Sequence, residues 1–490
     1  MLNFIPMNKT SRIFLFLFLL TVSLISEPSA QVSGPIEKII ENRGADDAFW
    51  ALQVRDSTGK LLESYNGDKL IRPASNLKLV VSAVYLHELG SDYRFKTNLY
   101  GIGEQNGDVW NGDLMIRGMG DPTINGDFND GDPLFLFEKW YRILKEKGIK
   151  RISGNIFGNE SYFDDIPYPK GWEWDDLSFY YGAEISALSF NSNVVELEVL
   201  ADSEIGSIPP IQWFPFNTNY VEFINEQVVT SANSKYDESY RRIPGTNTIL
   251  LRSKLPSGYY ETEPLSITNP AHYFIDTFAQ YLEMGGIEID GQLIVDRQIQ
   301  NWDSPDFLLF DEHTSKPLSE IVKWMNRESD NFFAEMLLKT VAAEKYNTEG
   351  STDLGLEIVK EFMNTAGLDS GSVVLKDASG MASATLLKLS NLNKLLVWMQ
   401  NHPEWDSYFE SMSAGGQNGT LKFRFGSSPV AGNFYGKSGF VTGVRTLSGY
   451  LHTQKNNRLI VSIATNNYAV RTSVVDVFHQ RILEYLYSAY

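Results

Sequence analysis

The spacing of apolar residues changes twice along this chain, and this pattern restricts the folds open to it. Residues 49–65 predict a hairpin of two half-buried strands, and residues 73–89 predict a helix that ends at Gly90. From Pro317 the helical period returns and strand-like runs follow. The predicted helices there span 317–343, 354–366, 384–400 and 473–487, and the predicted strands span 446–452 and 459–465. Both chain ends therefore read as α/β.

The middle of the chain, from residue 93 to about 300, has a different pattern. Short alternating runs are separated by Gly-, Pro- and Asn-rich stretches, which indicates strands. The predicted strands span 95–100, 113–117, 152–157, 194–200, 221–224 and 248–252, and the predicted helices span 133–146 and 270–284. We therefore expect an α/β (α+β) domain made of residues 31–93 and 301–490. Residues 94–300 would form inserted β-rich domains, expected to number two.

The N-terminus has the order of a secretory signal peptide. Lys9 and Arg12 precede an apolar run over residues 13–25, and the small residues of Pro28-Ser29-Ala30 follow. The apolar run is shorter than the roughly 20 residues that a membrane-spanning helix needs. We therefore expect residues 1–30 to be a signal peptide. The protein would be exported to the periplasm or cell envelope, with no transmembrane span in the mature chain.

Charge and residue usage exclude several classes of function. The net charge is −19, and an acidic protein repels nucleic acid and anionic membrane surfaces, so we expect neither as a partner. The chain has no cysteine, and its six histidines are scattered. A zinc site would therefore need carboxylates from distant segments. No G-x-S-x-G sequence is present, so the α/β-hydrolase signature is missing.

A serine followed three positions later by a lysine occurs twice, at Ser57/Lys60 and Ser75/Lys78. Ser57 lies in the turn of the predicted hairpin, where side chains point into water. Ser75 opens a predicted helix, so it shares a face with Lys78, and the helix N-terminus favours negative charge on the serine oxygen. Taken alone, an ordinary helix cap and a solvated lysine would explain this second pair better than catalysis.

Two further motifs follow in order. Ser-x-Asn occurs four times, but only Ser329-Asp330-Asn331 lies between two helical stretches, and Lys437-Ser438-Gly439 opens a run that leads into strands. The set S-x-x-K, S-D-N and K-T-G marks penicillin-binding proteins and class A β-lactamases. The first two are present to the letter and the third as Lys-Ser-Gly. The ordered set is therefore far more specific than any of its parts.

With these motifs the chain resembles the class C low-molecular-mass penicillin-binding proteins, the D-alanyl-D-alanine carboxypeptidase/endopeptidase family. The resemblance runs from about residue 36 to 487 and includes a long insert between the first and second motifs. Other stretches that carry it are 66–68, 118–123, 181–183, 186–189, 377–381, 414–415, 419–421 and 447–450. It implies a transpeptidase/β-lactamase-like domain built from both chain ends.

The resemblance also implies an activity. The protein would be a serine DD-peptidase that cleaves D-Ala-D-Ala bonds or DD-crosslinks of peptidoglycan stem peptides through an acyl-serine, and β-lactam antibiotics would acylate it. Neither a metal nor an organic cofactor is needed. The catalytic residues would be Ser75, Lys78, Ser329, Asn331 and Lys437. The substrate-binding residues would be Ser438, Gly439, Phe440, Asp377 and Ser379.

Within this set the resemblance gives each catalytic residue a role. Ser75 would be the nucleophile and Lys78 its base. Lys437 would hold the terminal carboxylate of the substrate, and its charge with partial burial would lower the pKa of Lys78. Ser329 would relay a proton to the leaving D-Ala, and Asn331 would hold the substrate amide and Lys78.

Two departures and two alternatives stay open. Ser438 replaces the commoner threonine but keeps the hydroxyl, whereas Phe440 stands where a smaller residue is usual and bears on which stem peptide fits. A serine β-lactamase shares the motifs, but no Glu-x-x-Leu-Asn stretch lies between the second and third. A non-catalytic penicillin- or peptidoglycan-binding sensor would also keep the cleft, and the intact Ser75, Lys78 and Lys437 argue against it.

Overall fold

The two chain ends share one antiparallel sheet. The computed structural model describes residues 32–41, 46–299 and 301–490, so the predicted signal peptide lies outside the described residues. The sheet has the order β2-β1-β23-β22-β21-β20. Its strands are β1 (Phe49–Asp56), β2 (Leu61–Tyr65), β20 (Ser413–Ala414), β21 (Phe434–Val441), β22 (Val444–His452) and β23 (Arg458–Asn466). Strand β1 pairs with β23 along its whole length, so the N-terminal hairpin is held by the C-terminal strands.

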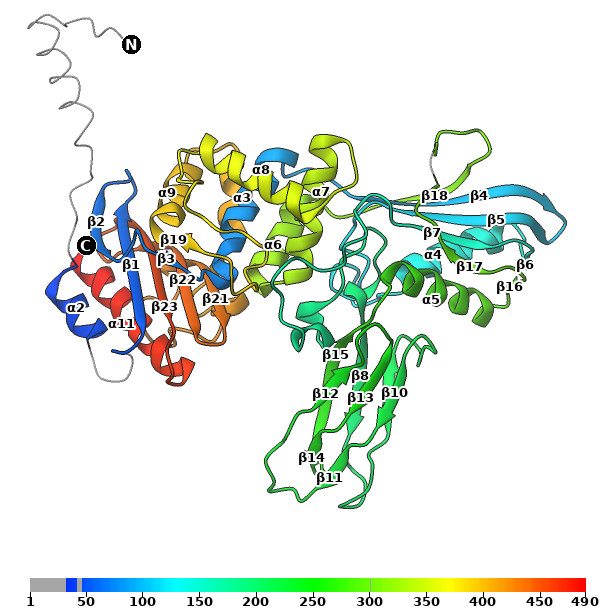
Figure 1. Cartoon of the computed structure of the whole chain (residues 1–490), viewed down its shortest axis with the longest axis horizontal. Helices are drawn as coiled ribbons and strands as arrows, with labels where there is room; N and C mark the ends of the chain where they lie inside the picture. Colours follow the sequence, from blue (N-terminus) through cyan, green and yellow to red (C-terminus); the bar gives the residue numbers. More distant parts are fainter. Residues whose placement is uncertain (1–31, 42–45, 300) are drawn as a thin grey trace, which may run out of the picture.

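Helices cover both faces of this sheet (Figure 1). Helices α2 (Gly34–Ile40) and α11 (Thr472–Ala489) lie on one face. The other face carries α3 (Leu77–Leu89), α6 (Leu318–Glu328), α7 (Asn331–Tyr346), α8 (Thr352–Thr365), α9 (Leu389–Met399) and α10 (Trp405–Glu410). Strand residues alternate between the faces. Leu447 and Leu451 of β22 accordingly pack in the cluster that contains α11, and Tyr450 packs in the cluster that contains α3.

The middle of the chain builds a second sheet of seven strands. Its order is β16-β6-β5-β4-β18, with β7 and β17 pairing beside β5. The strands are β4 (Lys96–Asn106), β5 (Val109–Gly118), β6 (Arg151–Ile152), β7 (Ile156–Asn159), β16 (Glu288–Ile289), β17 (Leu293–Val295) and β18 (Leu308–Thr314), and the accompanying helices are α4 (Phe135–Glu146) and α5 (Pro270–Met284). Strand β18 lies beyond residue 300 but pairs with β4. We therefore propose that the insert extends to about residue 314.

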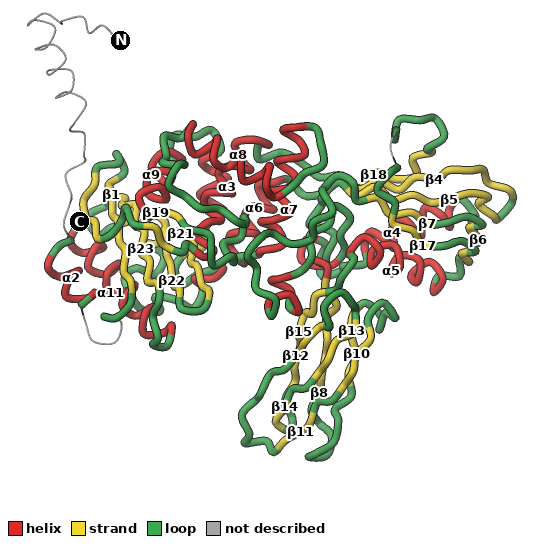
Figure 2. Tube along the Cα trace, in the orientation of Figure 1, coloured by secondary structure: helices red, strands yellow, loops and turns green. Residues whose placement is uncertain are grey.

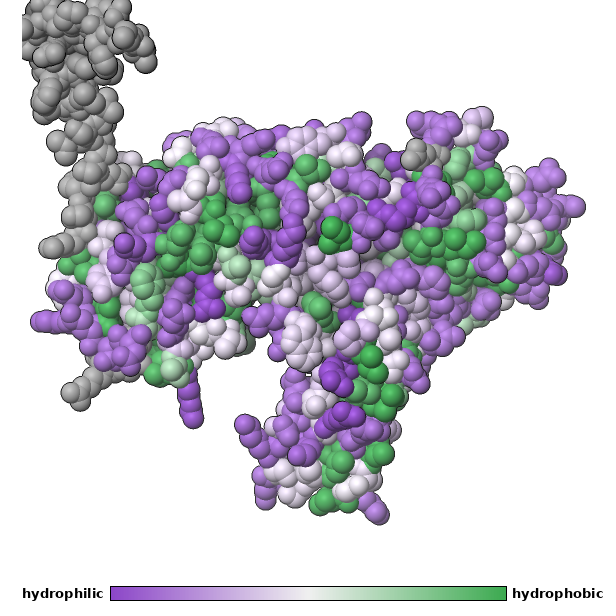
Figure 3. All heavy atoms as spheres, in the orientation of Figure 1, coloured by the Kyte–Doolittle hydropathy of each residue, from purple (hydrophilic) through white to green (hydrophobic). Residues whose placement is uncertain are grey.

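An arm of short strands projects from the insert (Figures 1 and 2). One of its sheets is β15-β8-β9 and another is β10-β13-β12, with the pair β11-β14 towards its far end. The strands are β8 (Val194–Leu200), β9 (Ile211–Phe214), β10 (Glu222–Asn225), β11 (Val228–Thr230), β12 (Tyr240–Arg242), β13 (Thr248–Leu251), β14 (Lys254–Pro256) and β15 (Tyr260–Ser266). Hydrophilic side chains cover most of the face in Figure 3, with apolar groups gathered on parts of the arm.

Three predicted elements differ from the structure. The helix expected over 317–343 is broken at Ser329, between α6 and α7. The strand expected over 152–157 is divided into β6 and β7. The helix expected over 384–400 begins only at Leu389, because Leu387 and Lys388 form a short strand, β19, that pairs with β3 (Leu70–Ile71). By contrast, the predicted strand 194–200 and helix 270–284 have the expected bounds. No helix in the described ranges is long and apolar enough to cross a membrane.

Candidate active site

Ser75 and Lys78 meet where the chain enters helix α3. Ser75 lies in a 3₁₀ turn, Ala74–Asn76, that continues directly into the helix, and Lys78 is the second helical residue. The Lys78 Nζ atom is 3.2 Å from Ser75 Oγ. Ser75 is partly exposed and Lys78 is fully buried. The turn therefore leaves the hydroxyl open to a ligand while the amine approaches it from inside the protein.

The second motif connects two helices above this pair. Ser329 ends α6 in the left-handed region, with φ 64°, and Asp330 begins α7 by accepting a hydrogen bond from the backbone N–H of Phe333. Asn331, the first residue of α7, accepts a hydrogen bond from Lys78 Nζ through Oδ1 at 2.7 Å. The tight turn thus brings Ser329 and Asn331 to the same cleft.

Strand β21 supplies the third motif. Lys437 is fully buried, and its Nζ donates to Ser329 Oγ at 2.8 Å and to the carbonyl of Ser438 at 2.9 Å. The Ser438 hydroxyl donates to Thr420 Oγ1 at 2.8 Å. Lys78 and Lys437 therefore contact the two ends of the Ser329–Asn331 motif.

Gly439 lets β21 pass close to the backbone of Ser75. A Cβ atom at this position would lie 2.3 Å from Thr446 Oγ1, 2.9 Å from the Pro73 carbonyl and 3.0 Å from the backbone nitrogen of Ser75. Only glycine fits such an approach without displacing the backbone of the serine. Phe440, the next residue, is 54% exposed at the edge of the cleft.

The loop that contains Asp377 and Ser379 lies beneath Lys78. The backbone carbonyl of Ser379 accepts from Lys78 Nζ at 2.8 Å, while its hydroxyl donates to Asp377 Oδ2 at 2.8 Å. Both residues are fully buried. Glu335 of α7 fixes the loop because its Oε1 accepts the backbone N–H groups of Ala378 and Ser379, each at 2.9 Å. These side chains thus support Lys78 from inside the protein.

Burial controls the charge of both lysines. Burial lowers the pKa of Lys78 to about 8, although Asp330, Asp377 and Glu335 oppose the shift by attraction. Burial also holds the pKa of Lys437 well below its usual range, and repulsion from Lys78 and Arg445 adds to the effect. Burial is therefore the largest cause of the lowered pKa of both lysines, and repulsion between the two amines acts in the same direction.

The structure brings eight of the ten predicted site residues into one hydrogen-bonded cleft, with Gly439 and Phe440 at its edge. Glu335, Trp172 and Tyr181 also contact the cleft and were not predicted to act there. Glu335 gives no sequence signal beyond being an acidic residue in an apolar helix. In the described ranges, no group of three or more His, Cys, Asp or Glu side chains could hold a metal ion.

Over most of its length the chain is similar to known proteins. The model of the D-Ala-D-Ala carboxypeptidase 3 (S13) family matches residues 32–481. A D-alanyl-D-alanine carboxypeptidase of Actinomadura sp. (strain R39) is 28% identical over 474 residues, which cover 92% of this chain and 84% of the relative. The D-alanyl-D-alanine carboxypeptidase DacB of Haemophilus influenzae is 27% identical over 469 residues, with 93% and 92% covered.

The fold is also similar to a solved structure. The crystal structure of penicillin binding protein 4 (dacB) from Haemophilus influenzae matches with a TM-score of 0.80 at 22% identity, covering 92% of this chain and 99% of that one. Since the family model spans almost the whole described chain, the chain belongs to the D-Ala-D-Ala carboxypeptidase 3 (S13) family and is a serine-type DD-peptidase with a transpeptidase-like fold.

Proposed function

We propose that Ser75 is the acylated nucleophile of this DD-peptidase and that Lys78 is its general base. The observation that carries the proposal is the 3.2 Å contact between Lys78 Nζ and the partly exposed Ser75 hydroxyl. A serine hydroxyl is a weak nucleophile until a neighbouring base takes its proton. In the described part of the chain no carboxylate lies within 4.0 Å of Lys78 Nζ, so no ion pair holds the proton on the amine.

The electrostatics of Lys78 support this role. An unperturbed lysine has a pKa of about 10.4 and is charged at neutral pH. With its pKa lowered to about 8, Lys78 is neutral in an appreciable fraction of molecules near physiological pH. The neutral amine can then take the Ser75 proton as the serine oxygen attacks the carbonyl carbon of the penultimate D-Ala.

Ser329 and Lys437 would serve the leaving group. Breakage of the C–N bond leaves an amine that needs a proton, and the Ser329 hydroxyl faces the cleft within 2.8 Å of Lys437 Nζ. We propose that Ser329 gives its hydroxyl proton to this amine and takes a replacement from the Lys437 ammonium, which donates to Ser329 Oγ. Lys437 with the Ser438 hydroxyl would bind the terminal carboxylate, for which a buried ammonium and a hydroxyl are suitable donors.

The backbone N–H groups of Ser75 and Phe440 are the proposed oxyanion hole. The close approach at Gly439 supports this assignment because it places strand β21 against the serine backbone. Such fixed donors stabilise the negative charge that develops on the carbonyl oxygen, by several kcal/mol in typical cases. Water then hydrolyses the acyl-serine and releases the enzyme.

Asp377 and Ser379 would position the base. Their side chains are buried and bonded to each other, and the Ser379 carbonyl accepts from Lys78. The sequence predicted that these two residues bind substrate. We propose instead that they hold Lys78 in place and do not contact the substrate.

The substrates would be peptidoglycan stem peptides that end in D-Ala-D-Ala or are joined by DD-crosslinks. Penicillin binding protein 4 of Haemophilus influenzae has been crystallised with a β-lactam, which supports β-lactams as covalent inhibitors of this chain. Export to the periplasm or cell envelope is proposed on the basis of the signal-peptide pattern and the nature of the substrate.

Intact-mass spectrometry after incubation with benzylpenicillin tests the nucleophile. A single adduct of penicillin mass on the wild type, absent from Ser75→Ala, is the expected result. Ser57→Ala is the matched control, because Ser57 is the other serine followed by a lysine at the same spacing. An adduct that persists on folded Ser75→Ala would refute the assignment, and so would no adduct on the wild type.

A further inference from the structure

We propose that residues 160–184 of the insert form a strap along helix α7 that positions Asn331, and through Asn331 the base Lys78, for acylation. This inference rests on the proposed function of those two residues. The strap is anchored at both ends of the helix and at its middle. Through the strap, the insert would help to position catalytic residues.

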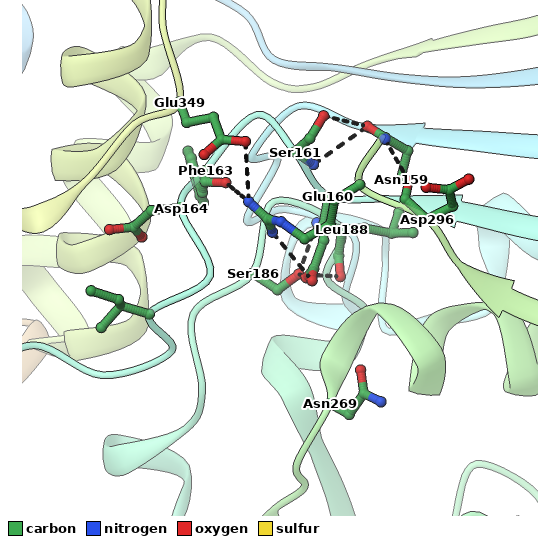
Figure 4. A network of polar contacts seen from close by, with 12 residues as sticks. Asn159, Glu160, Ser161, Phe163, Asp164, Ser186, Leu188, Asn269, Asp296 and Glu349 are labelled. Carbon is green, nitrogen blue, oxygen red and sulfur yellow. Dashed lines mark hydrogen bonds and ion pairs between the residues drawn. The ribbon is translucent and has the colours of Figure 1, made fainter. Parts of the chain in front are cut away.

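Just beyond the C-terminal end of α7, the backbone of the strap is hydrogen-bonded to Gly350, in the connection between α7 and α8. The backbone N–H of Gly350 donates to the carbonyl of Tyr162 at 2.9 Å, and the N–H of Asp164 donates to the carbonyl of Gly350 at 2.9 Å. Arg297, outside the strap, contacts three residues of the same region, all of them labelled in Figure 4. Its guanidinium lies 3.4 Å from Glu160 Oε1, donates to the carbonyl of Phe163, and lies 3.5 Å from Glu349 Oε1.

At the middle of α7, Lys339 binds two groups of the strap and fixes its position along the helix. Its side chain is only 2% exposed, and its Nζ donates to Asp164 Oδ1 and to the carbonyl of Ile166, each at 2.6 Å. A buried ammonium is costly unless it is paired and hydrogen-bonded. Both of these partners belong to the strap, so sliding or lifting the strap would leave the charge unpaired.

At the N-terminal end of α7, the strap reaches the cleft. The carbonyl of Tyr181 accepts from Asn331 Nδ2 at 3.1 Å. An ammonium can only donate, so Asn331 must turn its oxygen to Lys78 and its NH₂ group to another acceptor. Apart from the weakly accepting sulfur of Met381 at 3.5 Å, Tyr181 is the only acceptor that the described residues offer this group. The strap thereby sets which way the amide faces.

A second strap contact supports the other side of Lys78. Trp172 Nε1 lies 3.4 Å from Asp377 Oδ2, in the loop whose Ser379 carbonyl accepts from Lys78. Hydrogen bonds to a charged group favour the charged form. Release of the strap should therefore misplace the acceptors of the Lys78 ammonium, which slows acylation and lowers the pKa of the base.

The test compares Lys339→Met with Lys170→Met in the full chain. Lys170 is also on the strap, but its ion pair with Asp353 is exposed, unlike the buried contacts of Lys339. We expect Lys339→Met to lower the second-order rate constant of benzylpenicillin acylation at least about ten-fold, because small misplacements of catalytic groups cost up to about 100-fold. The acid limb of the pH profile should move to lower pH. Lys170→Met should stay within about two-fold of the wild type.

A double-mutant cycle separates positioning from general destabilisation. If Lys339 acts through Asn331, the effect of Lys339→Met should largely vanish in an Asn331→Ala background. The proposal would be overturned if Lys339→Met lowered the acylation rate constant by the same factor with and without Asn331→Ala. It would also be overturned if Lys339→Met lowered the rate at every pH without moving the acid limb. If Lys339→Met does not fold, Trp172→Phe takes its place. This variant should slow acylation and shift the acid limb in the same direction, and a wild-type profile would overturn the proposal.

The outcome for the strap is independent of the outcome for the nucleophile. Wild-type acylation by Lys339→Met, with none by Ser75→Ala, would refute the strap alone. Acylation that persists in Ser75→Ala would refute the proposed function itself.

Discussion

Glu335 and Ser379 are joined by a hydrogen bond next to Lys78. Glu335 Oε1 accepts the backbone N–H of Ser379 at 2.9 Å, and the carbonyl of the same serine accepts from Lys78 Nζ at 2.8 Å. Burial, with repulsion from Asp377, raises the pKa of Glu335 from 4.5 to about 8. One buried carboxyl thus fixes an acceptor of the proposed base while it is itself mostly protonated at neutral pH.

We predict that Glu335→Gln removes part of the pH dependence of stability. Between pH 4.5 and 8 the folded protein keeps a proton on Glu335 that the unfolded chain releases. The contribution to stability is therefore full below pH 4.5 and is lost as pH rises towards 8, at about 1.4 kcal/mol per pH unit. Glutamine cannot ionise, so the variant should lose less stability than the wild type between pH 5 and 7.5.

Denaturant unfolding of both proteins at pH 5 and 7.5 measures this difference. Equal pH slopes would contradict the raised pKa of Glu335.

The pH dependence of acylation should follow Lys78. The base acts when neutral, so with a pKa of about 8 the acylation rate should rise with pH up to about 8 and then level off. At pH 6 it should be on the order of 100-fold below the plateau. Stopped-flow measurement with a chromogenic β-lactam gives the profile. A flat profile from pH 6 to 9 would exclude Lys78 as the titrating base.

Gly439→Ala should damage the site by steric conflict alone. Its Cβ would fall 2.3 Å from Thr446 Oγ1 and 3.0 Å from the Ser75 backbone nitrogen, so β21 or the serine must move. We expect overpacking to cost about 1–3 kcal/mol in unfolding free energy and acylation to be nearly lost. Gly34→Ala, where nothing lies within 4 Å of the new Cβ, is the control. Wild-type acylation by Gly439→Ala would show that the backbone approach is not needed.

Ser438 should be replaceable by threonine but not by alanine. Its hydroxyl donates to Thr420 Oγ1 at 2.8 Å and is proposed to help bind the terminal carboxylate. Ser438→Thr keeps this group, whereas Ser438→Ala should raise KM for a D-Ala-D-Ala peptide about ten-fold, the loss expected for a hydrogen bond to a charged group. Steady-state kinetics of both variants measures this difference. Equal KM values for Ser438→Thr and Ser438→Ala would show that the hydroxyl does not help to bind the substrate.

Phe440 should affect the choice of substrate without affecting the fold. It is 54% exposed, so Phe440→Ala removes little buried area and should leave the melting temperature within about 1 °C. The ratio of kcat/KM values for two stem peptides that differ in the third residue should change. An unchanged ratio would show that Phe440 does not contact this part of the peptide.

The order of the elements could be predicted from the sequence, and so could the three motifs. Helical spacing identified the helix after Ser75, and strand alternation identified Val194–Leu200 and most of the C-terminal sheet. The family resemblance predicted that Ser75, Ser329 and Lys437 lie in one site. Local patterns suffice here because the first two motifs lie at helix ends and the third lies within a strand that leads into the C-terminal sheet.

The supporting residues could not be predicted, because their roles depend on contacts between distant segments. Trp172 lies 3.4 Å from an oxygen of Asp377, and Lys339 reaches Asp164 and Ile166, although nothing in their local sequence indicates these partners. The short strand at Leu387 was likewise predicted as helix because its pairing with Ile71 is a tertiary contact. Propensity cannot reveal such contacts.

The pairing of β1 with β23 means that the catalytic sheet can be completed only after the C-terminal strands have been made. A chain made from its N-terminus presents Ser75 and Lys78 early, but Lys437, Gly439 and the strands that frame the serine are made last. The first sheet strand must therefore wait for Asn466 before it has a partner on that side. The residues proposed to act on the substrate are therefore brought together only when almost the entire polypeptide has been made.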